Sequence, residues 1–418
     1  MKILMMVLHL PPAAVGGAEY QCLRQARALV ARGHEVTILT QWLYARSPRR
    51  EMQAGVEIRR CGFCLPGTTL ARGLHDKIAT WRKSAAEPID FALEPAGTAK
   101  RSTGSFRWMS LAERPGKWSF IAEVQWLIRS GRLKGDVVHS HESHWLAGLA
   151  QWAAEQMGVP VFCKETFQPV LLFCGATDVP HAEEWQTRRR ECGFIAMSAG
   201  IARDLQKEGI PPGRIVEIPN GVDIPVQIAE PGRHPDALYV GNFTQGSAHK
   251  GFDILLQALG KARRAEPGLK LHLYGSGDSR VWRSYARQQG CGDSAIFEGR
   301  TDDIWAAHRR CGYLILPSRK EGLSNALIEA MASGLPAIVS DIEANRMAIQ
   351  DGQEGLIVPV DDVPALAEAM VKMHRFSDLR ATMGQAARAR VEKQFAIDKI
   401  AEQLEHAYQQ AIDRRVQK

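Results

Sequence analysis

The fold of this chain is decided by the stretch Pro317-Ser-Arg-Lys-Glu-Gly-Leu-Ser-Asn-Ala-Leu-Ile-Glu-Ala-Met-Ala-Ser-Gly-Leu-Pro336. It predicts a glycine-containing loop followed directly by a short helix. Ser324 or Asn325 is a good N-cap for that helix, and Gly334 with the proline just beyond it is a good stop signal. The sequence therefore predicts an open helix N-terminus that faces the end of a loop.

An open helix N-terminus is a binding site for anions. Backbone N–H groups at Leu323, Ser324 and Asn325 have no partner within the helix, and the helix dipole adds partial positive charge at the same place. Two acids bracket the site, Glu321 in the loop and Glu329 inside the helix. The arrangement suits a ligand with an anionic middle and hydroxyl-rich ends, and a nucleotide sugar has that shape.

The bulk properties are those of a globular protein with more than one core. The chain has 418 residues, 45% of them apolar and 24% charged, with a net charge of +7. This length favours two domains. No apolar run reaches the roughly 20 residues that span a bilayer. The apolar start at Lys2–Leu8 is short and leads into a helical pattern rather than a cleavage site, which predicts a buried strand in a cytosolic protein.

Eight cysteines are spread along the chain without a disulfide pattern. Cys61-Gly-Phe-Cys64 is the only close pair, and no second pair with matching spacing completes a zinc or redox site. We therefore predict free thiols, with metal or redox use of the pair as the alternative.

Strand-like runs alternate with helical patterns along most of the chain, which favours parallel sheets covered by helices. The first unit is a strand over Lys2–Leu8, a helix that follows Gly16-Gly17, and a second strand over Glu35–Thr40. The loop lacks the Gly-x-Gly-x-x-Gly pattern, and no acid follows the second strand, so a dinucleotide site is not expected. Residues 43–134 are less regular.

A second alternating series starts at Ala237, after a turn-rich and proline-rich segment near 223–236. The predicted fold class is therefore α/β, with two Rossmann-like doubly wound domains that face each other across a cleft. The predicted domains are residues 1–222 and 223–395, and a C-terminal helix at about 396–418 is expected to pack back on the first domain. Ligands of such sheets bind beyond the carboxyl ends of the strands, so the cleft is the expected active site.

The combination of motifs resembles the retaining nucleotide-sugar glycosyltransferases of the GT-B fold, in the large family whose signature is Glu-x7-Glu (family four). Glu321 and Glu329 have that spacing. The resemblance extends over most of the chain, because its other motifs occur in the family's order. They are Gly16-Gly17-Ala-Glu, Asp136-Val-Val-His-Ser-His141, Ile218-Pro-Asn-Gly-Val-Asp223, Val240-Gly-Asn and Lys250-Gly251.

The resemblance implies roles for the residues of the second domain. Glu329 would hydrogen-bond the ribose of the donor, and Glu321 would lie near the donor sugar. Lys250 would neutralise the diphosphate leaving group. The backbone over Gly322, Leu323, Ser324 and Asn325 would hold the sugar or the diphosphate. For Lys250 and the two glutamates the alternative is an ordinary solvated surface position.

His141 would face the donor sugar from the first domain, where it could hydrogen-bond the sugar or stabilise developing charge. His139, within the strand, is expected to be packed. The three nearby histidines 139, 141 and 144 could instead ligate zinc, although no further ligand is evident. Gly16 and Gly17 would let the backbone approach the sugar phosphate, or they form an ordinary strand-to-helix turn.

Three further positions concern the donor site. Arg300 follows a strand end that lies beside the nucleotide base in this family, so it is a candidate base-binding residue. Many family members carry an arginine where this chain has Asn242, which removes one cation from the expected donor site. Asp302-Asp303 resembles a metal-binding Asp-x-Asp but stands at a helix start, where we expect a capping role.

The implied activity is that of a retaining, metal-independent hexosyltransferase that needs no cofactor beyond its nucleoside-diphosphate sugar. It would act in the synthesis of a cell-envelope glycan such as lipopolysaccharide, capsule or exopolysaccharide. Two alternatives stay open: a sugar-nucleotide epimerase or phosphorylase on the same fold, and a non-catalytic protein that binds nucleotide sugars or glycans during assembly. Front-face attack, with the leaving phosphate helping to take the acceptor proton, is the mechanism implied by the family.

Segment 100–134 combines positive charge with aromatic residues, against only two acids. This composition suits an anionic membrane surface or a lipid-linked, phosphorylated acceptor, which would place the protein on the inner face of the cytoplasmic membrane. The acceptor expected from the implied activity is a glycan or a lipid-linked molecule. An amphipathic helix that packs on its own domain explains the pattern equally well. Nucleic acid is not expected, since no binding motif accompanies the charge. The residues are Lys100, Arg101, Arg107, Arg114, Lys117, Arg129, Arg132 and Lys134, with Phe106, Trp108, Trp118, Phe120 and Trp126, and the acids Glu113 and Glu123.

Overall fold

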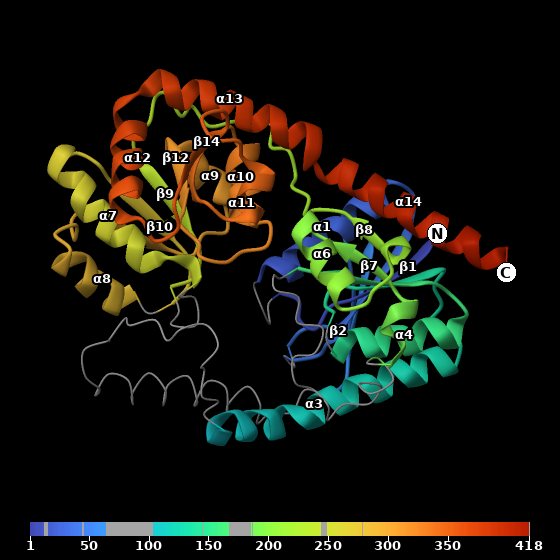
Figure 1. The fold of residues 1–418 in the computed structure, drawn as a ribbon. Coiled ribbons are helices and arrows are strands. Elements are labelled where there is room, and N and C mark those ends of the chain that lie inside the picture. The colour runs from blue at the N-terminus through green and yellow to red at the C-terminus, as the bar shows by residue number, and fades with distance from the viewer. Residues whose placement is uncertain are drawn as a thin grey trace.

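The protein forms two α/β units, as the computed structural model shows (Figure 1). The structure describes residues 1–11, 16–43, 46–63, 103–143, 145–166, 185, 187–243, 249–277 and 279–417, without the side chains of 103–114. Cys64, His144 and the start of segment 100–134 lie outside the described residues. The predicted α/β class with two doubly wound domains is confirmed.

The N-terminal unit is an eight-stranded sheet with the order β3-β4-β2-β1-β5-β6-β7-β8. Every pair in it is parallel except β3 and β4. Its elements are β1 Lys2–Met6, α1 Gly17–Ala31, β2 Glu35–Gln41, β3 Arg50–Gln53, β4 Val56–Cys61, α3 Thr103–Arg129, β5 Val137–Ser140, α4 Trp145–Met157, β6 Val161–Glu165, the 3₁₀ turn Arg189–Glu191, β7 Gly193–Ala196, α6 Ala199–Lys207, the 3₁₀ turn Pro212–Arg214 and β8 Ile215–Glu217.

The C-terminal unit is a six-stranded parallel sheet with the order β11-β10-β9-β12-β13-β14. Its strands are short, largely apolar runs between turn residues. Its elements are β9 Ala237–Val240, α7 Phe252–Ala265, β10 Leu271–Tyr274, α8 Ser279–Gln288, β11 Ala295–Gly299, α9 Ile304–Arg309, β12 Tyr313–Leu316, α10 Asn325–Ala332, β13 Ala337–Ser340, α11 Glu343–Ala348, β14 Gly355–Val358, α12 Val363–Arg375 and α13 Ser377–Gln394.

The last helix, α14 (Ile397–Val416), leaves the C-terminal unit and returns to the N-terminal one (Figure 1). It packs on α1 and buries Ile400, Leu404 and Tyr408 in the core beneath the first sheet. A parallel β-bridge joins Val222 to Ala396, where the chain crosses for the second time. The two sheets are thus linked by two crossing segments, 218–236 and the start of α14.

The β3–β4 hairpin lies in the region that the sequence pattern left irregular. Its two turn residues, Ala54 and Gly55, both have positive φ, at 50° and 79°. Such a turn usually carries Asn-Gly or Asp-Gly, so the Ala-Gly pair gives no hairpin signal. The strand β4 also alternates with charged residues, as expected for strands near a sheet edge.

Most of the described part of segment 100–134 belongs to α3. This helix has a buried apolar face and also carries exposed aromatic side chains. One face, with Phe120, Val124 and Ile128, is buried against the first sheet and α4. Trp118 and Trp126 on another face are each half exposed, at 50% and 51%. The amphipathic packing is therefore real, and it leaves two large aromatic side chains in solvent.

The described cysteines are buried free thiols, namely Cys22, Cys61, Cys163, Cys192, Cys291 and Cys311. Burial raises the pKa of the Cys61 thiol to about 12, which keeps it protonated and unreactive. Within the described ranges, no helix is long and apolar enough to cross a membrane.

Two buried histidines make the fold sensitive to acid. Burial lowers the pKa of His139 and of His308 from 6.5 to about 3, so both are neutral in the folded protein. The unfolded chain takes up these protons near pH 6.5, so stability falls as the pH drops below that value. The expected loss is about 2 kcal/mol for each histidine between pH 7 and pH 5. Urea unfolding at the two pH values measures it.

The matched variants for this test are His308→Gln and, at an exposed position, His406→Gln. Since a glutamine side chain does not take up a proton in this range, His308→Gln should lose about 2 kcal/mol less than the parent protein over the same interval. Equal losses in the parent and in His308→Gln would show that His308 does not carry the acid sensitivity.

Candidate active site between the two domains

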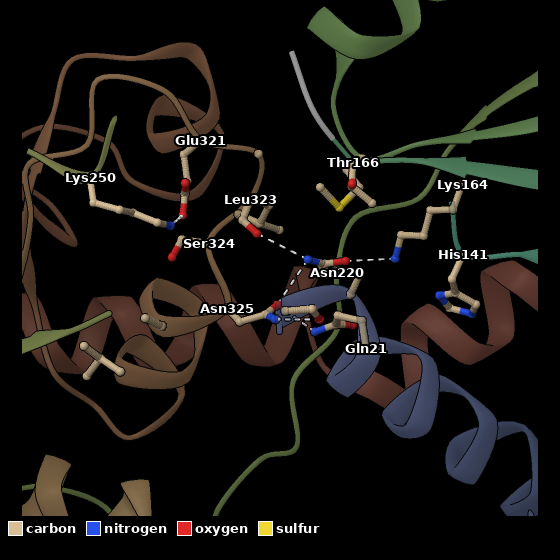
Figure 2. Close-up of a pocket in the computed structure, with 16 residues that line it drawn as sticks. Gln21, His141, Lys164, Thr166, Asn220, Lys250, Glu321, Leu323, Ser324 and Asn325 are labelled. Carbon is tan, nitrogen blue, oxygen red and sulfur yellow. Dashed lines mark hydrogen bonds and ion pairs between the residues drawn. The ribbon is translucent and has the colours of Figure 1, made fainter. Parts of the chain in front are cut away.

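A cavity of about 320 Å³ lies between the two units (Figure 2). It opens beyond the carboxyl ends of β5 and β6 on one side and at the N-terminus of α10 on the other, as expected for ligand sites of parallel sheets. The residues that line it are Gly17, Ala18, Gln21, His141, Lys164, Thr166, Met197, Asn220, Val240, Lys250, Glu321, Gly322, Leu323, Ser324, Asn325 and Ala326.

Lys250 and Glu321 form an ion pair on the C-terminal wall of the cavity. The Glu321 side chain is only 9% exposed and that of Lys250 25%, so the pair is largely shielded from water. Gly251, which follows the lysine, has φ of 66°, and a Cβ there would lie 2.0 Å from the carbonyl oxygen of Pro317. Only glycine fits, which explains the Lys-Gly pair next to the loop that carries Glu321.

The N-terminus of α10 is open toward the cavity. Ser324 is its N-cap residue, but its side chain makes no capping hydrogen bond. By contrast, Asp303 caps α9 by accepting from the backbone N–H of Ala306 at 3.0 Å, which confirms the predicted capping role. No capping side chain among the described residues satisfies the first-turn N–H groups of α10, which suits them to bind an anion.

His141 follows β5 directly and lies on the N-terminal wall. Its backbone N–H donates to the carbonyl of Met6 at 2.9 Å, and its ring stacks on that of His139 with centroids 4.3 Å apart. The side chain is buried, yet neither ring nitrogen has a hydrogen-bond partner among the residues that the structure describes. Burial, and then the proximity of His139 and Lys164, lowers the pKa of His141 well below 6.5. A neutral imidazole can both donate to and accept from substrate hydroxyls.

Lys164 on β6 lines the same wall but was not predicted. It is 2% exposed, and its ammonium donates to Oδ1 of Asn220 at 2.8 Å. Burial lowers its pKa to about 7. A lysine next to an acid at the end of a strand carries no sequence signal for a site, because the same pattern is typical of a strand at the surface.

Amide side chains close the seam between the two domains beside the cavity (Figure 2). Asn220 donates to the carbonyl of Leu323 at 3.2 Å and to Oδ1 of Asn325 at 3.1 Å. Gln21 of α1 donates to the same Oδ1 at 2.9 Å, and Asn325 donates to the carbonyl of Gly17 at 3.1 Å. Asn325, the first residue of α10, is therefore hydrogen-bonded both to α1 and to the crossing segment 218–236.

Glu329 lies on α10 behind the cavity, outside the set of residues that line it. Arg24 of α1 pairs with its carboxylate at 2.9 Å and also with Asp223 at 3.0 Å. Burial raises the pKa of Glu329, although Arg24 opposes that effect. In this structure the glutamate therefore links the two domains.

The remaining predicted positions differ in their relation to the cavity. Gly17 lines it, whereas Gly16 does not. Asn242 is exposed and accepts from the backbone N–H of Ser276 at 3.3 Å, and Arg300 is also exposed. Neither is among the lining residues. The sequence thus brings together eight of the twelve named residues, namely Gly17, His141, Lys250, Glu321, Gly322, Leu323, Ser324 and Asn325.

The described residues include no group of three His, Cys, Asp or Glu side chains that could hold a metal ion. His139, considered above as one of three zinc ligands, is instead buried, and its Nδ1 lies 2.6 Å from the Tyr408 hydroxyl. It is therefore packed, as expected for a strand residue. His144 lies outside the described residues.

Two doubly wound units with a polar cavity between them define a GT-B fold, and solved structures agree. The chain superposes on Anabaena HepE in complex with UDP with a TM-score of 0.66 at 16% identity, over 97% of this chain and 99% of that one. Residues 15–225 match the family described as Glycosyltransferase Family 4, and residues 234–375 match the one described as Glycosyl transferases group 1. The first match spans half of the sequence. The chain belongs to glycosyltransferase family 4.

Curated relatives differ in what they make. The phosphatidyl-myo-inositol mannosyltransferase of Mycobacterium leprae is 32% identical over 59% of this chain and 66% of its own length. The glycogen synthase of Mycobacterium tuberculosis is 26% identical over 88% of this chain and 85% of its own length. The aligned region thus spans just under two thirds of the mannosyltransferase.

Proposed function

We propose that the protein is a retaining glycosyltransferase that moves a hexose from a nucleoside diphosphate to an acceptor hydroxyl. The observation that carries this proposal is the shared cavity. Lys250, the open N-terminus of α10 and His141 all border it. Membership of family 4 supports the same activity.

The donor diphosphate would lie between Lys250 and the first turn of α10. Negative charge accumulates on the leaving diphosphate as the glycosidic bond to the sugar breaks, and both features are placed to stabilise it. Glu321 already pairs with the lysine, so the pair is set at a fixed position before substrate binds. With these charges in place, we propose that the reaction requires no metal ion.

The transferred sugar would lie next to His141. Its neutral ring can hydrogen-bond a sugar hydroxyl without repelling the positive charge that develops at the anomeric carbon. We propose front-face attack with retention, in which the leaving phosphate oxygen accepts the proton of the acceptor hydroxyl. The seam made by Gln21, Asn220 and Asn325 would keep water from the sugar.

The nucleoside would extend past the cavity toward Glu329 and Arg300. The carboxylate of Glu329 now pairs with Arg24. When the donor binds, this carboxylate would leave Arg24 and accept hydrogen bonds from the ribose hydroxyls. Asn242 and Gly16 stay proposed donor contacts at the edges of the site. The bound UDP of the Anabaena structure makes UDP a first choice of nucleotide to test.

The acceptor is proposed to be a cell-envelope glycan or a lipid-linked, phosphorylated precursor, made at the inner face of the cytoplasmic membrane. The mycobacterial relative is named for a lipid acceptor, which supports this choice. The exposed face of α3 supports it independently, because Trp118 and Trp126 are half exposed there and Arg132 lies against Trp126. The guanidinium of Arg132 lies 4.4 Å from the centre of the Trp126 ring.

Replacing both exposed tryptophans should weaken membrane binding. We expect Trp118→Ser/Trp126→Ser to bind vesicles containing phosphatidylglycerol about tenfold less tightly than the parent, since interfacial aromatics and nearby arginines act together. Sedimentation with vesicles measures this. Phe376→Ser, at an exposed position of the other domain, is the matched control. Equal binding by the parent to vesicles of phosphatidylcholine alone, or by both variants to anionic vesicles, would exclude the α3 surface.

Product analysis tests the proposed activity against its alternatives. The protein is incubated with UDP- and GDP-hexoses alone, with inorganic phosphate, and with lipid and glycan fractions of bacterial envelopes. Transfer to a fraction with release of the nucleoside diphosphate is the expected result. An isomerised nucleotide sugar without acceptor would indicate an epimerase, and a phosphate-dependent sugar phosphate would indicate a phosphorylase. Binding without any product would identify an assembly protein.

A further inference from the structure

We propose that Lys164 and His141 form an anion subsite on the N-terminal wall, which binds a carboxylate or phosphate of the substrate other than the donor diphosphate. The proposal rests on the proposed function, because it assigns the class of sugar or acceptor that the same cavity selects.

The first observation is a buried ammonium without a counter-charge. Lys164 is 2% exposed, and among the described residues no carboxylate pairs with it. Its neighbour Glu165 is engaged elsewhere, with Ser143 and with the backbone N–H of Thr166 at 3.0 Å. Asn220 supplies one neutral oxygen to an ammonium group that has three hydrogens to donate.

Such a group is costly to keep charged. An unpaired buried charge pays a desolvation penalty that a neutral hydrogen bond does not offset. In agreement, burial lowers the pKa of Lys164 to about 7. A bound anion would offset the penalty and favour the protonated lysine.

The second observation is the position of Lys164 across the cavity from the donor phosphate site. Figure 2 shows Lys250 and Glu321 on one side and Lys164 with His141 on the other. The described lining residues contain two lysines, and the charge of Lys250 is already matched by Glu321. Of these two lysines, Lys164 is the one that has no carboxylate partner among the described residues.

The third observation is the ring of His141 beside it. His141 lines the same cavity, and both of its ring nitrogens are buried without a hydrogen-bond partner among the described residues. A carboxylate or phosphate has several acceptor oxygens, so it could take one hydrogen bond from the imidazole and another from Lys164. The expected substrate is therefore a uronic acid or a phosphorylated sugar, either as the transferred unit or as the acceptor.

Matched ligand pairs test the subsite by calorimetry. UDP-glucose is compared with UDP-glucuronate for the transferred sugar. For the acceptor, glucose and mannose are compared with their 6-phosphates in the presence of saturating UDP. We expect at least tenfold tighter binding of the charged member in one pair, and loss of that preference in Lys164→Met. Lys164→Gln, which can still donate to Asn220, serves as a second variant in case Lys164→Met folds poorly.

UDP alone is the internal control, and its affinity should change less than threefold in both variants. If UDP-glucuronate binds more tightly than UDP-glucose, the anion belongs to the transferred sugar. If a sugar 6-phosphate binds more tightly than the free sugar, the anion belongs to the acceptor. The subsite is refuted if neither pair shows a preference, if the preference survives in the variants, or if UDP itself weakens to the same degree. Failure of UDP and GDP to bind at all would instead refute the proposed function.

Discussion

Replacing Lys250 by alanine is expected to lower turnover by about 10²- to 10³-fold at saturating donor. The lysine stabilises the charge that appears on the diphosphate only as the sugar departs, so the loss should fall mainly on kcat. The substitution also leaves the carboxylate of Glu321 without its cation in a site where that side chain is 9% exposed. Release of the nucleoside diphosphate measures the effect.

Lys261→Ala is the matched control, since this lysine is exposed on α7 and lies outside the cavity. Lys250→Arg should recover part of the turnover because it keeps the charge but changes its position. Unchanged kcat in Lys250→Ala would mean that the diphosphate is stabilised elsewhere, and the proposed orientation of the donor would be wrong.

Replacing Gly322 by alanine is expected to lower kcat/KM by about 100-fold, because the added methyl group would push the two domains apart at the cavity. A Cβ at this position would lie 2.3 Å from the carbonyl oxygen of Thr166 and 2.7 Å from the Cε of Met197. Both belong to the N-terminal domain, so the loop beside α10 must move away from the opposite wall. A displacement of about 1 Å between reacting groups can cost this much.

The control for this substitution is Gly268→Ala, where a Cβ meets no atom within 4 Å. Because the clash in Gly322→Ala lies between the domains and not within a core, the melting temperature should change by only a few degrees. Full activity in Gly322→Ala would show that the reaction takes place with the two domains further apart than in the structure described.

The fold was largely predictable because its strands are short apolar runs between clear stop signals. Gly334, for example, follows the end of α10 with a positive φ of 83°, as its predicted role as a stop signal requires. The β3–β4 hairpin was not predictable, since Ala54 occupies a turn position that favours asparagine or glycine. The packing of α14 on the first domain was expected, although an amphipathic pattern alone does not say which domain a helix covers.

The site was predictable where a motif carries backbone geometry, as at Lys250-Gly251 and at the N-terminus of α10. The site was harder to predict for side chains whose role depends on contacts between segments that are distant in the sequence. Lys164 and Asn220 are 56 residues apart in the sequence and form a hydrogen bond only in the folded chain. Gln21 and Asn325, which also form one, are 304 residues apart. Glu329 was assigned to the donor, yet here its carboxylate holds Arg24.

Calorimetric titration with UDP, GDP and ADP tests the central claim, which is that the interdomain cavity binds the diphosphate of a nucleotide sugar. The account predicts one site per chain for at least one of these nucleotides, with affinity lowered at least tenfold in Lys250→Ala and unchanged in Lys261→Ala. If none of the three, nor their hexose conjugates, binds at millimolar concentration, the claim is contradicted. Binding of equal strength in both variants would contradict it as well.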